Sequence, residues 1–123
     1  DQRFFLQPFA ISGDRDSIPT AVQPSGSVSY AQGFGVDYEL NLATEPTAKP
    51  IPRGSTNGLF YDITFALGDL QRNGTPEFIT TGDNGGTPYA YAKGALVRWR
   101  ASGGDPYRVY VSRQDNNTSA PSA

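Results

Sequence analysis

Residues 55–73 read STNGLFYDITFALGDLQRN and contain the clearest periodic pattern of the sequence. Their apolar residues recur four, three and four positions apart, the spacing of one helix face: Leu59, Ile63, Ala66 and Leu70. Phe60 and Leu67 widen that face. Ser55 or Thr56 can cap its start, and Asn73-Gly74 before Pro76 can stop it. We therefore predict one central amphipathic helix of about 17 residues.

Two glycines interrupt this helix, Gly58 and Gly68. Each weakens a helix by roughly 1 kcal/mol relative to Ala. We interpret them as positions where another part of the backbone packs closely, and expect tertiary or quaternary contacts to hold the helix.

The part before the helix reads mostly as loop. Residues 4–11 are a short apolar run interrupted by Pro8, either an edge strand or an extended arm. Residues 12–54 are rich in turn-forming residues, with one brief candidate strand at residues 27–30. A loop of roughly 40 residues is uncommon in an isolated domain. We therefore expect this segment to gain order by packing on other copies or on a partner.

The part after the helix reads as short β-structure. Residues 95–100 and 107–112 alternate as strands do, and Gly103-Gly104 can connect them as a hairpin. Residues 77–80 are a further short candidate strand, and residues 83–86 a tight turn. The fold class is thus α+β, with a loop-rich N-terminal arm, one central helix and a small C-terminal antiparallel hairpin region. We divide the chain into residues 1–88 and residues 89–123.

Composition narrows the function classes. Gly and Pro occupy 24 of the 123 positions, whereas 15 aromatics argue against disorder, so the chain should be ordered but rich in loops. The net charge is -2 and no basic block occurs, which makes nucleic acid an unfavourable partner. No run approaches the roughly 20 apolar residues that span a bilayer, so we expect no membrane insertion.

The sequence offers little catalytic chemistry. His and Cys are both absent, which removes the commonest general base and the usual transition-metal ligands. Asp14 and Asp16 match only the opening of a calcium loop, so we interpret them as part of a turn. Asp37 and Glu39 are a carboxylate pair without any feature that would separate their pKa values. We predict a protein that is not an enzyme and uses no cofactor or metal.

Five aromatic residues near the C-terminal end admit two interpretations: Tyr89, Tyr91, Trp99, Tyr107 and Tyr110. They could stack on sugar rings, or they could form the core of the small hairpin region. We favour the core, because so small a unit has few other residues to bury.

Short motifs in a fixed order carry a family resemblance. They are Pro8-Phe9-Ala10, Ser12-Gly13-Asp14, Ile18-Pro19, residues 23–30, Gly33-Phe34, Asp37-Tyr38-Glu39, Ile51-Pro52-Arg53, Asn57-Gly58-Leu59, residues 61–64, residues 84–89 and Lys93-Gly94-Ala95. Together, over residues 4–97, they resemble the N-terminal domain of bacteriophage tail fibre proteins. The sequence departs from that pattern at Gly54-Ser55-Thr56, where longer side chains usually lead into the helix. The end of the chain is similar to the opening of a small carbohydrate-binding-like unit, and we expect the natural chain to continue beyond Ala123.

The resemblance implies a structural protein of the virion tail. It implies a homotrimeric fibre whose first domain docks on another tail protein, an adaptor, nozzle or baseplate component. The distal part would then bind a polysaccharide or receptor on the host surface. The helix residues expected to face the three-fold axis are Leu59, Ile63, Ala66 and Leu70. The residues expected to dock on the tail are Phe4, Phe5, Leu6, Phe9, Tyr30, Phe34 and Tyr38. The alternative is a carbohydrate- or host-receptor-binding module, which predicts an exposed Trp99 and Tyr107.

Overall fold

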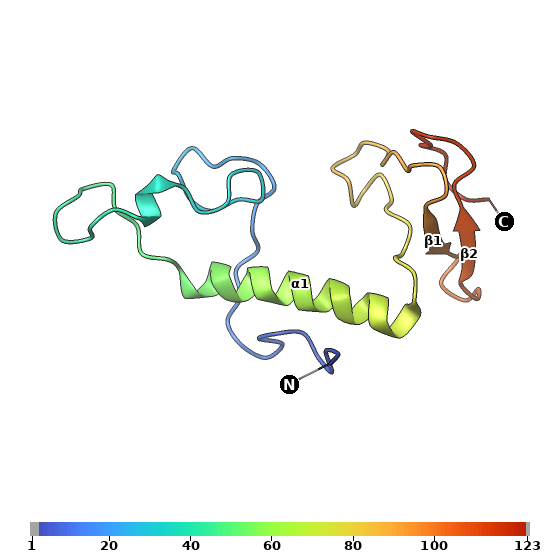
Figure 1. Cartoon of the computed structure of the whole chain (residues 1–123), viewed down its shortest axis with the longest axis horizontal. Helices are drawn as coiled ribbons and strands as arrows, with labels where there is room; N and C mark the ends of the chain where they lie inside the picture. The colour runs from blue at the N-terminus through green and yellow to red at the C-terminus, as the bar shows by residue number, and fades with distance from the viewer. Residues whose placement is uncertain (1–2, 123) are drawn as a thin grey trace. The chain divides into compact units, whose positions relative to one another are not determined.

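The computed structural model describes residues 3–122 of the chain. Their elements are the 3₁₀-helix η1 (Val36–Tyr38), the α-helix α1 (Arg53–Asn73) and the strands β1 (Leu96–Trp99) and β2 (Arg108–Val111) (Figure 1). The chain is therefore a small α+β protein, as its pattern predicts. It forms two compact units, Asp1–Gly68 and Asp69–Ala123. The functional boundary between residues 88 and 89 stays a prediction.

The central helix is longer than its sequence pattern predicts. The backbone N–H and the hydroxyl of Thr56 both donate to the carbonyl oxygen of Pro52, at 3.1 and 2.8 Å. Ser55 and Thr56 thus lie inside the helix, and their assignment as caps was wrong. Pro is well suited to a helix start because its φ is fixed and no N–H is left unpaired there.

The predicted end of the helix is confirmed. Gly74 has a φ of +77°, in the left-handed region that glycine enters without steric cost. Its N–H donates to the carbonyl oxygen of Leu70 at 2.8 Å, which satisfies one of the last carbonyl groups of α1.

In the first unit, residues 9–16 pack against one face of α1. An added Cβ at Gly58 would collide with the backbone carbonyl oxygen of Asp16, so the close approach predicted there is confirmed. The N–H of Asp16 donates to the carbonyl oxygen of Gly54 at 3.0 Å. The guanidinium of Arg15 lies 3.9 Å from the centre of the Tyr61 ring. Gly68 is also buried.

The loop before α1 is held partly by the chain itself. Ile18, Val28 and Ser29 are buried there. The N–H of Tyr30 donates to the carbonyl oxygen of Pro19 at 2.9 Å. Residues 27–30 do not form the predicted strand. Ser29 forms only an isolated bridge with Gly33, across a tight turn that is too short for a ladder of paired residues. Residues 4–11 form bends and a turn rather than an edge strand, which leaves the arm interpretation.

The second unit is built on the predicted hairpin. β1 and β2 pair antiparallel, with Leu96 opposite Val111 and Trp99 opposite Arg108. The strand expected at residues 77–80 is only a parallel bridge between Glu77 and Arg98. Pro76 starts this segment and has no N–H to donate, although its carbonyl oxygen accepts from Arg98 at 2.9 Å. Residues 81–86 form turns, as predicted around Asp83.

Candidate functional site

One face of α1 keeps its apolar residues at the surface. We call this face the α1 stripe; it consists of Leu59, Ile63, Ala66 and Leu70, flanked by Leu67. Ile63 is 45% exposed, Leu67 45% and Leu70 39%. Ala66 is exposed and Leu59 half-buried. Exposed apolar patches of this kind mark contact surfaces, since isolated proteins usually bury such residues.

The other faces of α1 are covered in part by the chain itself. Gly54, Gly58 and Tyr61 are spaced by four and three residues and so share a face, which residues 14–16 cover. Beside that face, the Thr64 hydroxyl accepts from the N–H of Phe9 at 2.7 Å. Phe9 also packs on Phe60 at the edge of the α1 stripe. The other contacts of residues 9–16 lie away from the stripe, and Ile63, Ala66 and Leu70 stay exposed.

The residues predicted to dock through the arm differ in their exposure. Phe4 is 56% exposed and Leu6 75%. Phe5 is half-buried. The ring of Phe9 is half exposed and packs edge-on against Phe60, with 5.4 Å between ring centres. Leu6 and Phe4 thus present the most apolar surface of the arm.

The three aromatic residues predicted to dock through the loop also have contacts within the chain. Phe34 packs edge-on against Tyr38, with 5.1 Å between ring centres. The Tyr38 hydroxyl accepts from the N–H of Val28 at 3.1 Å, so Tyr38 stabilises the loop itself. Phe34 keeps 38% of its surface exposed and Tyr30 50%. Their role in docking stays a prediction.

Tyr30 has the one strongly raised pKa resolved in the described chain. Its hydroxyl donates to the carboxylate of Asp62 on α1. Partial burial, and then the hydrogen bond and negative charge of Asp62, raise the pKa of Tyr30 to about 12. Each cause penalises the phenolate form. The contact therefore ties the loop to α1 and does not prepare Tyr30 for proton transfer near neutral pH.

Two of the carboxylates weighed as catalytic or metal-binding groups, Asp14 and Asp37, are engaged in structural contacts. Asp37 lies 3.9 Å from the Lys49 ammonium. Asp14 forms an ion pair with Arg53. Thr80 donates its hydroxyl and its N–H to Asp83, which lowers the pKa of Asp83. Within residues 3–122, no group of three or more acidic side chains could hold a metal ion.

The aromatic residues of the second unit pack on one another. Trp99 is half-buried and meets Tyr110 edge-on at 5.8 Å between ring centres. Tyr107 is 39% exposed, but the guanidinium of Arg100 lies 4.4 Å from its ring centre and its hydroxyl donates to Glu77. Trp99 and Tyr107 therefore do not form the open sugar platform that the alternative interpretation predicts.

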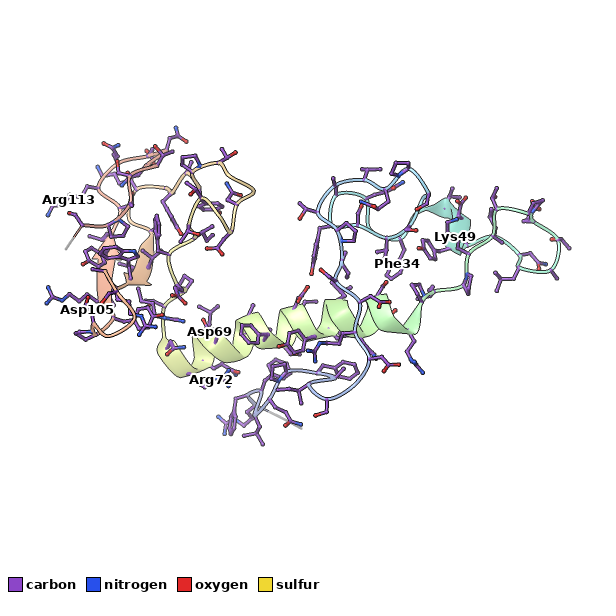
Figure 2. The ribbon with its side chains drawn as sticks, turned by 180° about the vertical axis from the view of Figure 1, so that it is seen from behind. Phe34, Lys49, Asp69, Arg72, Asp105 and Arg113 are labelled. Atoms are coloured by element: carbon purple, nitrogen blue, oxygen red, sulfur yellow. The ribbon has the colours of Figure 1, made fainter. Side chains whose placement is uncertain are left out.

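A buried arginine organises this unit, which sequence reasoning missed. Arg98 is 8% exposed and donates to both carboxylate oxygens of Asp69 at 3.1 Å. It also donates to the carbonyl oxygen of Thr75 at 2.6 Å and lies 3.5 Å from Glu77. Asp69 is on the last turns of α1 (Figure 2). The cluster of Arg98, Asp69 and Glu77 joins the end of α1 to β1. Because both carboxylates pair with Arg98, we interpret the cluster as structural.

The second unit also contains a cavity that the sequence did not predict. Its volume is about 400 Å³, and residues 119–122 form part of its wall. The aromatic side chains that line it are Phe78, Tyr91 and Tyr110. Arg113, which follows β2, also lines it. No sequence signal marks a cavity assembled from four separate short segments.

The chain matches no protein-family model, and no curated protein is similar enough to be identified as a relative. None of the helices among the described residues combines the length and the apolar character needed to cross a membrane.

Proposed function

We propose that this chain is the N-terminal, virion-attached part of a bacteriophage tail fibre. The arm and the α1 stripe work by protein–protein contact, and the fibre's distal part binds the host surface. The observation that carries the proposal is the set of large apolar side chains at the surface, above all Leu6, Phe4 and Ile63. The resemblance of residues 4–97 to tail fibre domains supports the same function.

The two surfaces take different partners in this proposal. The α1 stripe packs on the same stripe of two other copies, because most homo-oligomers close with point-group symmetry and a three-fold ring is one such closure. The arm and the exposed loop aromatics dock on an adaptor, nozzle or baseplate protein of the tail. Aromatic and large apolar side chains contribute much of the binding free energy in such interfaces.

The direct test is binding of the purified chain to tail particles that lack fibres, measured by co-sedimentation, beside binding to host cells. We expect binding to the tails and none to the cells. Leu6→Asp should weaken tail binding at least tenfold, since burying an unpaired carboxylate costs roughly 2 kcal/mol or more. Leu42→Asp is the matched control, because Leu42 is 62% exposed but lies outside both surfaces. Binding to cells and not to tails would overturn the proposal.

A second candidate function is carbohydrate or host-receptor binding by the second unit. The observation that favours it is the cavity lined by Phe78, Tyr91 and Tyr110. Ligand sites are commonly concave, largely apolar and furnished with a few polar groups. This candidate uses different residues from tail attachment, so the two functions can coexist in one chain.

A further inference from the structure

The cavity of the second unit is lined by both aromatic and polar residues. Phe78 and Tyr91 stack with 5.6 Å between ring centres and 26° between planes. Val97 and Tyr110 continue the lining from the paired strands β1 and β2. At about 400 Å³ the cavity lies in the range of small-ligand sites, roughly 300–1,000 Å³.

Some polar groups of the lining have no hydrogen-bond partner within the described part of the chain, and two of them carry the argument. They are the hydroxyl of Tyr110 and the guanidinium of Arg113, whereas the side chains of Ser112 and Asn117 already bond each other at 3.1 Å. Asp115, two residues beyond Arg113, instead accepts from the N–H of Lys93 at 2.9 Å. Arg113 therefore offers an uncompensated positive charge beside an apolar surface.

This combination fits a sugar ring that carries a carboxylate. The C–H groups of a sugar ring are slightly positive and pack on the negative faces of aromatic rings. Its hydroxyl groups can bond Tyr110, and a guanidinium pairs with a carboxylate through two parallel hydrogen bonds. An extended peptide fits less well, because the backbone groups of Tyr91 and Asn117 at the cavity bond each other at 2.9 Å.

We propose that the cavity binds a carboxylated saccharide, with Arg113 holding the carboxylate and Phe78, Tyr91 and Tyr110 contacting the ring. The proposal rests on the second candidate function and is independent of tail attachment. It names the substrate class of that site as uronate-type sugars rather than neutral hexoses.

The test is calorimetric titration of the full chain with tetragalacturonate and with its fully methyl-esterified form, which has the same rings without the charge. We expect the acidic form to bind at least tenfold more tightly, the lower range for a hydrogen bond to a charged group. Arg113→Gln should remove that preference. Lys93→Gln, which removes an exposed cation outside the cavity lining, should preserve it.

Three outcomes would overturn the proposal: no binding at millimolar sugar, equal binding of both forms, or unchanged preference in Arg113→Gln. Equal or tighter binding of tetraglutamate would reassign the cavity to acidic peptides. Because Arg113 is exposed, Arg113→Gln should leave the Trp99 emission spectrum unchanged, which checks the fold. The same variant should still bind fibreless tails, so failure of the saccharide site and failure of tail attachment are separable.

Discussion

Replacing Gly58 by alanine should destabilise the first unit, although the same change stabilises most helices. Gly58 is buried where the carbonyl oxygen of Asp16 crosses α1, and the added Cβ would collide with that oxygen. The obstacle is backbone rather than a flexible side chain, so residues 14–16 must move away from the helix. That movement threatens the hydrogen bond from Asp16 to Gly54 and the packing of Arg15 on Tyr61.

The magnitude follows from three terms. Overpacking costs about 2 kcal/mol, the middle of the usual range. Loss of one backbone hydrogen bond costs about 1 kcal/mol. Alanine returns about 1 kcal/mol of helix propensity. The free energy of unfolding should therefore fall by about 2 kcal/mol, which lowers the urea midpoint by about 1 M for a slope near 2 kcal/mol/M.

The assay is urea unfolding followed by circular dichroism at 222 nm, because α1 is the one α-helix among residues 3–122. Gly54→Ala is the matched control. An added Cβ at Gly54 meets the carboxylate of Asp16, an exposed side-chain end that can rotate away. We expect its midpoint to stay level or rise. A Gly58→Ala midpoint that rises as much as that of Gly54→Ala would refute the packing of residues 14–16 on α1.

Three further predictions concern other contacts. The chain should sediment as three copies of 13.2 kDa, with a mass of about 40 kDa. Ile63→Asp should sediment with the mass of a single copy, whereas the control Leu42→Asp should keep the trimer mass. An unchanged mass in Ile63→Asp contradicts the trimer. Arg98→Met should lower the midpoint of urea unfolding, measured by Trp99 fluorescence, by about 1 M, because it removes a largely buried hydrogen bond between charged groups worth roughly 2 kcal/mol. Arg100→Met loses one hydrogen bond and should lower the midpoint about half as much. Equal effects of the two changes would count against the Arg98 cluster. Folding stabilises the neutral phenol of Tyr30, so the contribution of this side chain to the free energy of unfolding is complete below pH 10 and is lost as the pH rises from 10.0 to about 12. Tyr30→Phe should therefore reduce the fall of the unfolding midpoint between those pH values. An unchanged pH profile in Tyr30→Phe would exclude the contact of Tyr30 with Asp62 as the cause of that fall.

The sequence predicted a helix or its end well where a single local signal, such as apolar spacing or a glycine, was sufficient. The spacing of the apolar helix residues and the left-handed glycine at Gly74 defined α1 and its end. The start was misassigned because Ser55 and Thr56 are good caps in isolation, whereas Pro52 supplies the required carbonyl without leaving an N–H unpaired. Gly58 signalled a close backbone approach, but its partner Asp16 is distant in sequence and could not be named.

The candidate sites were less predictable because they depend on which side chains are exposed and on contacts between residues that are distant in the sequence. The sequence indicated which apolar and aromatic residues could dock on a partner. Only the structure distinguishes Leu6, which is exposed, from Tyr38, whose hydroxyl accepts a hydrogen bond from Val28 within the same loop. A charged residue in a strand normally predicts solvent exposure, and Arg98 is buried because Asp69 and Glu77 approach it from other segments. The cavity beside Arg113 likewise arises from packing between segments.

The most direct test of the proposed tail attachment is a reattachment experiment with fibreless phage particles. Fibreless particles are incubated with the purified chain, intact fibres are then added, and infectivity is counted. Because the chain would occupy the fibre's own docking site, we predict a dose-dependent loss of infectivity that Leu6→Asp relieves and Leu42→Asp does not. Full infectivity at a saturating concentration of the chain would contradict its role as the tail-attachment part of the fibre.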